Sequence, residues 1–177
     1  MQKLSLSFLI IMTLLSSGCK IVKDEEKTVS LKDFRVQSEI SGWTEEDGSY
    51  QLYDLVLLRA GAMNGDADQY GDKGMIEGIE QKLVQDKPYL QLFIMDFGTA
   101  AAAASMFDVK AQQIAAKQTI GAYEQTVAVS TKYSRGGIIT YAHFDKYYIE
   151  LQFETYAEAD FAYADAALFL AFYEEKL

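Results

Sequence analysis

The segment covering residues 89–97 constrains the fold most, because it is apolar on both sides of a two-residue alternation. Successive strand residues point to opposite faces of a sheet. One face of this segment would carry Tyr89, Phe93, Met95 and Phe97, and the other would carry Leu90, Leu92 and Ile94. A strand with two apolar faces lies in a sheet that is covered on both sides. Half of the 177 residues are hydrophobic, so the chain can supply such layers.

The rest of the chain predicts helices that pack on this sheet. Apolar spacing predicts helices over residues 50–60, 100–116 and from 155 onward. The last helix would pack through Phe161, Ala164, Leu168 and Phe172. Apolar runs predict strands over residues 76–84, 89–97, 125–133, 138–144 and 146–154. We therefore expect an α+β fold with a largely antiparallel five-stranded sheet, in the order α-β-β-α-β-β-β-α.

A tight hairpin is expected at Asp145 and Lys146, which separate two apolar runs. With these two residues in the turn, Phe144 lies opposite Tyr147, and one face of the hairpin is polar and aromatic together. That face carries Tyr141, His143, Tyr148, Glu150 and Gln152. Such a mixture suits contacts with a carbohydrate, a peptide or a protein, and the alternative is that a helix covers it.

The N-terminus has the features of an export segment. A short basic start is followed by the nearly apolar residues 4–15, by Ser16, Ser17 and Gly18, and then by Cys19. The apolar run is shorter than the ~18–20 residues that cross a bilayer, which favours a cleaved signal over a membrane anchor. The alternative is an ordinary secretory peptide with a chance cysteine.

Residues 15–19 resemble the bacterial lipoprotein signal, in which the cysteine becomes the lipidated first residue. The resemblance implies removal of residues 1–18, lipidation of Cys19, and a membrane contact made through that lipid. Residues 19–38 are charge-dense and predict a polar tether, although their apolar residues leave a first strand or helix open. Residues 39–177 would then form a single α+β domain. Lys20 after the cysteine points to the outer membrane or another extracytoplasmic membrane face.

The folded part also resembles uncharacterised bacterial exported domains of unknown function. The resemblance is in the order and type of segments over residues 42–177 and implies the fold and the location only. The segments that carry it are Leu52-Tyr53-Asp54-Leu55-Val56, Lys73-Gly74-Met75-Ile76-Glu77-Gly78, Met95-Asp96-Phe97-Gly98-Thr99 with the alanine run that follows, and Tyr141-Ala142-His143-Phe144-Asp145 with residues 146–151.

Charge and composition exclude several classes of function. The 16 basic and 26 acidic residues give a net charge of −10, so no basic face is available for nucleic acid. The single cysteine excludes an internal disulfide and a cysteine zinc cluster. The single histidine, His143, excludes sites built from several imidazoles. With Asp145 two residues later it could act as a general base, but the chain has no Gly-x-Ser-x-Gly nucleophile motif.

Residues 66–77 follow the spacing of a calcium-binding loop. Asp66, Asp68, Asp72 and Glu77 supply the oxygen ligands that calcium prefers. Tyr70 replaces one expected ligand, and Lys73 adds a positive charge to the run. A solvated acidic loop is therefore the alternative to a weak calcium site, and no other cofactor is indicated.

Together these patterns predict a non-enzymatic, lipid-anchored binding or assembly domain in the cell envelope. Its partner would be an envelope protein, a peptide or a glycan. The alternatives are an envelope hydrolase or other enzyme that uses the His143 region, and a calcium-dependent binding module. A cleft with convergent carboxylates and His143 would favour the enzyme, and a flat aromatic patch would favour the binding domain.

Overall fold

A computed structural model of the chain describes residues 29–60, 66–86, 88–114, 120–123, 128–133, 137–156 and 159–177. The signal segment and Cys19 lie outside these residues. The elements, in chain order, are η1 (Leu31–Phe34), β1 (Thr44–Glu45), β2 (Gln51–Asp54), α1 (Leu55–Ala60), α2 (Ala67–Asp72), β3 (Glu77–Val84), β4 (Tyr89–Asp96), α3 (Ala100–Gln112), β5 (Ala128–Tyr133), β6 (Gly137–Phe144), β7 (Tyr147–Glu154) and α4 (Ala159–Lys176).

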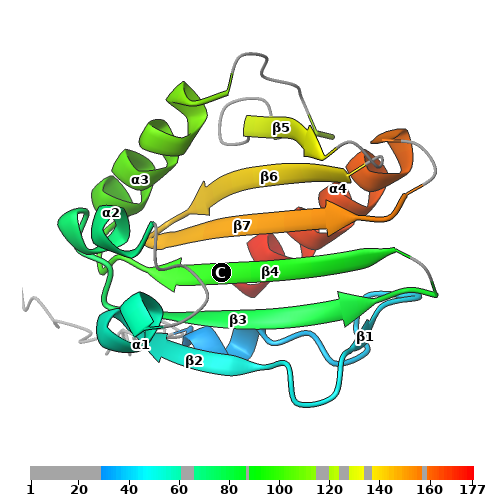
Figure 1. The fold of residues 1–177 in the computed structure, drawn as a ribbon, viewed down its shortest axis with the longest axis horizontal. Helices are drawn as coiled ribbons and strands as arrows, with labels where there is room; N and C mark the ends of the chain where they lie inside the picture. The colour runs from blue at the N-terminus through cyan, green and yellow to red at the C-terminus, as the bar shows by residue number, and fades with distance from the viewer. Residues whose placement is uncertain are drawn as a thin grey trace, which may run out of the picture.

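The strands form one antiparallel sheet with the order β1-β3-β4-β7-β6-β5, and β2 also pairs with β3 (Figure 1). The predicted α+β class is confirmed, and the five predicted strands correspond to β3–β7. The two additional strands, β1 and β2, are short and share the edge of β3. Among the described residues, none of the helices is long and apolar enough to cross a membrane.

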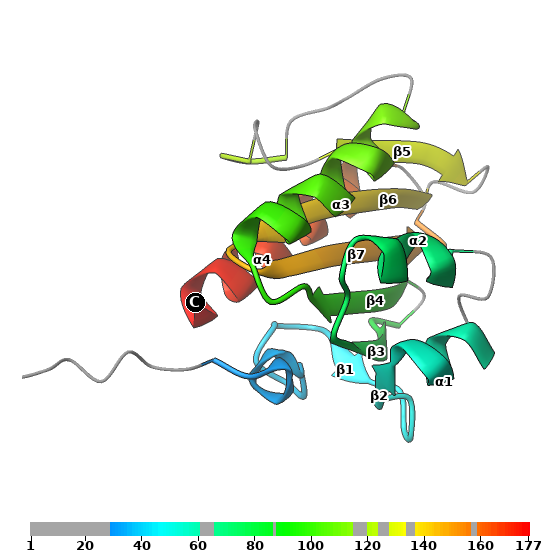
Figure 2. The ribbon, with the colours of Figure 1, turned by 90° about the vertical axis from the view of Figure 1, so that its left-hand side faces the viewer.

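Both faces of the sheet are covered, as the apolar pattern of residues 89–97 predicts. Helices α1, α2 and α3 lie on the front face in Figure 1, and η1 and α4 lie behind it; Figure 2 shows these layers from the side. In β4, Leu90, Leu92 and Ile94 join the core behind the sheet, whereas Phe93 and Met95 join the core in front. The central position of β4 between β3 and β7 follows from its two apolar faces.

The hairpin of β6 and β7 confirms the predicted register. Phe144 lies opposite Tyr147, and Ala142 lies opposite Ile149. Asp145 occupies the turn with φ of 47°, a left-handed conformation that aspartate tolerates better than most residues. The predicted helix cap at Thr99 is also confirmed, because its side chain accepts a hydrogen bond from the Ala102 backbone N–H at 3.2 Å.

The N-terminal segment belongs to the packed domain. Val29, Leu31, Phe34 and Val36 are buried in the core behind the sheet. The Val36 N–H donates to Gln81 Oε1 at 3.0 Å, and Gln81 Nε2 donates to the Val36 carbonyl at 2.5 Å. The predicted boundary at residue 39 is therefore wrong, and the alternative of a first helical turn is the one observed. Leu31, Phe34 and Val36 pack into the core although the charged residues of the same segment lie between them in the sequence.

The segment predicted as a helix over residues 50–60 is split. Residues 51–54 form β2, in which Gln51 pairs with Glu80 and Asp54 with Glu77 of β3. The helix α1 begins only at Leu55, and Asp54 Oδ1 accepts the Leu57 N–H at 2.8 Å. Hydrogen bonds to the edge of β3 outweigh the helical pattern, because an unpaired strand edge leaves backbone groups without partners.

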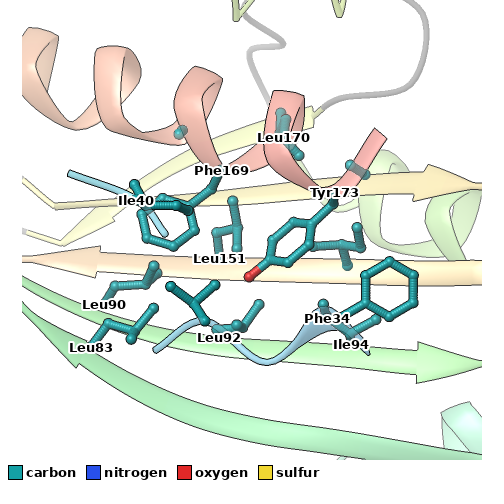
Figure 3. Packing of buried hydrophobic residues seen from close by; sticks show 14 of the residues in the cluster. Phe34, Ile40, Leu83, Leu90, Leu92, Ile94, Leu151, Phe169, Leu170 and Tyr173 are labelled. Atoms are coloured by element: carbon teal, nitrogen blue, oxygen red, sulfur yellow. The ribbon is translucent and has the colours of Figure 1, made fainter. Parts of the chain in front are cut away.

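The buried face of α4 differs from the predicted one. The predicted residues Phe161 and Leu168 are 61% and 54% exposed. The helix instead packs through Ala162, Ala166, Phe169, Leu170 and Tyr173. Figure 3 shows Phe169, Leu170 and Tyr173 directed at the strands, with Phe34 beside Tyr173. Alanines at 162 and 166 let the helix approach the sheet closely, which is why this face is the buried one.

Candidate functional site

The predicted ligand-binding face lies in the core. Tyr141, Tyr148 and Glu150 share one face of the sheet with His143, as the register predicts. However, Tyr141, Tyr148 and Glu150 are buried in front of the sheet, together with residues of α2 and α3. This prediction is therefore corrected: a helical layer covers the aromatic and polar face, and its side chains serve packing.

Glu150 is the centre of a buried hydrogen-bond network. Its carboxylate accepts Tyr148 OH at 3.2 Å, Tyr70 OH at 3.3 Å and Gln152 Nε2 at 2.6 Å. Burial raises the pKa of Glu150, and the positive charge of Lys110 opposes this shift. The network joins α2 to the sheet, because Tyr70 comes from α2 and the other members come from β7.

His143 is half-buried and its ring contacts that of Phe107 at 5.2 Å between centroids. Burial lowers the pKa of His143, and Asp108 on α3 partly offsets this effect. Asp145, which the sequence offered as its partner, lies exposed in the turn between β6 and β7. The charge acting on the imidazole therefore comes from α3 and not from the predicted Asp145.

The calcium-like run does not form a loop around an ion. Its residues 67–72 form α2, and its last acidic residue, Glu77, begins β3. Asp66 pairs with Lys110 at 2.8 Å, and Asp68 pairs with Arg59 at 2.9 Å. No group of three or more carboxylates that could hold a metal occurs in the described part of the chain. The calcium prediction at Asp66, Asp68, Asp72 and Glu77 is therefore corrected.

A polar hollow of about 410 Å³ lies on β2 and β3, between the sheet and the loop that joins β1 to β2. Glu80, only 4% exposed, accepts hydrogen bonds from Tyr53 OH and from Gln91 Nε2. Ser49 holds the loop against β3 through two hydrogen bonds of 3.1 Å. Its Oγ donates to the Lys82 carbonyl and accepts from the Lys82 N–H. Sequence reasoning missed this hollow because it assigned residues 50–60 to a helix.

A second, more apolar groove of about 550 Å³ lies where α4 passes the ends of β4 and β7. Its lining residues include Pro88, Tyr156, Phe161, Ala164 and Asp165. Tyr156 OH donates to Asp165 Oδ2 at 2.6 Å, which holds one wall of the groove in place. The sequence contained a signal for this surface, because residues 159–176 carry apolar residues on two different faces.

Comparison of the chain with family models, curated proteins and solved structures gave no match.

Proposed function

We propose that this chain is a lipid-anchored extracytoplasmic binding or assembly domain without enzymatic activity. The observation that carries the binding function is the outer face of α4, defined here by Phe161, Ala164 and Leu168. These residues recur at i, i+3 and i+7 and are exposed. A helix that is apolar on two faces is normally buried on both, and exposed apolar patches mark interaction sites.

The proposed anchor is the lipid on Cys19, after removal of residues 1–18. Its support is the apolar run that ends in small residues immediately before the only cysteine. Lipidation would also consume a thiol that could pair wrongly in an oxidising compartment. The residues from 20 to 28 span at most ~32 Å, at ~3.3–3.6 Å per residue, so the domain would remain near the membrane.

The geometry favours binding over an enzyme that uses the His143 region. The two strongest titratable candidates, His143 and Glu150, contact side chains of the covering helices or of the core. A general base must reach a bound substrate with its lone pair, and packed side chains are poorly placed for this role. The outer face of α4, in contrast, is open to a partner.

The anchor is tested by fractionating cells that express the full chain with Cys19→Ala, with Ser17→Ala as the matched control. We expect the Cys19→Ala chain to leave the membrane fraction and the Ser17→Ala chain to remain in it. Equal membrane association of wild type and Cys19→Ala would refute the lipid anchor.

The binding function is tested by site-specific photocrosslinking in the same cells. A photoreactive residue replaces Ala164 on the outer face of α4 or, as the control, the exposed Ala101 on α3. We expect one defined adduct from position 164, none from position 101, and loss of the adduct in Phe161→Ser/Leu168→Ser. Identical patterns from both positions, or no adduct from position 164, would refute a binding role for this face.

A further inference from the structure

The outer face of α4 has the shape of a helix-docking surface. Phe161 and Leu168 lie along the helix on either side of the smaller Ala164, so the face presents two projecting side chains with a recess between them. Side chains spaced at i and i+3 or i+4 form the ridges that interdigitate when two helices pack. The groove continues this surface past Tyr156 to Pro88. Such a contour fits one helical segment better than a flat partner.

The acidic residues around this face favour a partner whose docking segment is positively charged. Asp165 lines the groove, and Glu175 is exposed two helical turns beyond Leu168. Lys176 is the cation on this side of α4 in the described residues, and it lies over the Phe172 ring at 4.7 Å. A second copy of a chain with net charge −10 would meet the same acidic rim and be repelled.

We infer that the outer face of α4 docks an amphipathic helix of another protein, whose apolar ridge is flanked by Lys or Arg. The apolar ridge would fill the recess at Ala164 and cover Phe161 and Leu168. The flanking cations would face Asp165 and Glu175. This inference depends on the proposed binding function and adds the chemical class of the partner.

The position of the face relative to the tether supports this assignment. The chain enters the domain at Val29, whose carbonyl accepts Tyr147 OH at 2.7 Å at the first residue of β7. The groove lies at the other end of β7, beside Thr155. Eight strand residues separate the two points by ~26 Å at ~3.3 Å per residue. The N-terminal end of the outer face therefore points away from the point of attachment, where a second protein can reach it.

The test measures binding of synthetic helices to a chain that starts at Lys20 and keeps every described residue. The probes are a Leu/Lys amphipathic peptide, a Leu/Glu peptide of the same pattern, and a Ser/Lys peptide without the apolar ridge. Fluorescence anisotropy gives the affinity of each peptide. We expect the Leu/Lys peptide to bind at least ~10-fold more tightly than the other two, and its affinity to fall with salt.

Variants separate this face from the rest of the acidic surface. Phe161→Ser/Leu168→Ser should weaken binding of the Leu/Lys peptide at least ~10-fold, and Asp165→Asn/Glu175→Gln should reduce the salt dependence of that binding. Val56→Ser/Leu57→Ser removes two exposed apolar residues from α1 and should change nothing. Circular dichroism and melting confirm that each variant is folded.

Three results would overturn the inference. Equal affinities for the Leu/Lys and Leu/Glu peptides would remove the charge argument. Unchanged binding in Phe161→Ser/Leu168→Ser would show adsorption to the acidic surface elsewhere. Dimerisation of the wild-type chain in sedimentation experiments, lost in the same variant, would identify a second copy as the occupant. If any of these occurs while the crosslink at position 164 persists, the binding function stands and only the partner class is wrong.

Discussion

Replacing Phe34 by alanine tests whether the N-terminal segment is part of the fold. Phe34 is fully buried, and its ring meets those of Tyr147 and Tyr173 edge-on at centroid distances of 4.7 and 5.9 Å. Truncating a buried phenylalanine to alanine costs ~3–5 kcal/mol of unfolding free energy. Domains of 5–15 kcal/mol total stability tolerate such a loss only narrowly, so the effect should be large.

We therefore expect Phe34→Ala to lower the free energy of unfolding by about 4 kcal/mol and the melting temperature by roughly 8–16 °C. The assay is urea unfolding, followed by the fluorescence of Trp43. This residue is buried in the same core and contacts Phe169 at 5.4 Å between ring centroids. The control is Lys32→Ala, an exposed change in the same helical turn that should stay within ~0.5 kcal/mol.

A chain that begins at Ser38 should be destabilised more than Phe34→Ala, because it also loses Val29, Leu31 and Val36 from the core. A loss below ~1 kcal/mol in Phe34→Ala, or a chain from Ser38 with the melting temperature of wild type, would show that residues 29–36 do not contribute to the core. Residues 29–36 would then act as a tether after all.

Three further outcomes follow from the structure. Glu150→Gln should become more stable relative to wild type as pH rises above about 4.5. The raised folded pKa of Glu150 stabilises the wild-type fold at low pH, and this contribution is lost as pH rises through that pKa. Urea unfolding at pH 4 and pH 7 checks this, with the exposed Glu175→Gln as the control that should show no such change. Thr99→Ala should cost about 1 kcal/mol in urea unfolding, since it removes the cap of α3, and a loss no greater than that of an exposed substitution would show that the cap contributes little. Millimolar calcium should leave the melting curve as it is in chelator, because residues 67–72 are helical and Asp66 and Asp68 face cations; a calcium-specific rise in melting temperature would restore the metal site.

The sheet could be predicted because its strands carry their own evidence. The segment that became β4 is apolar on two faces, and Asp145 and Lys146 interrupt the next pair of strands at a two-residue turn. These patterns are local, so they can be recognised without knowing which segments pack against each strand. The register of β6 and β7 then placed Tyr141, Tyr148 and Glu150 on one face correctly.

The candidate site was predicted less well, because covering and exposure are not local properties. The face that carries Tyr148 and Glu150 has the composition of a binding surface, yet α2 and α3 lie over it. The acidic run at Asp66 has the spacing of a calcium loop, yet Lys110, which pairs with it, lies 44 residues further along the chain. No residue near Asp66 in the sequence indicates that Lys110 will pair with it.

The sequence by itself determined the segments that became β3–β7, α3 and α4, and it determined that the sheet needs a layer on each face. The tertiary structure alone decided which of two apolar faces of α4 would be buried. Phe161, Leu168 and Phe172 repeat at helical spacing as well as Ala162, Ala166 and Phe169 do. Hydrophobic periodicity identifies apolar faces of a helix, but it does not predict which of two such faces packs against the sheet. Small residues at 162 and 166 permit close approach to the strands, and Phe161 and Leu168 are thereby left on the outside.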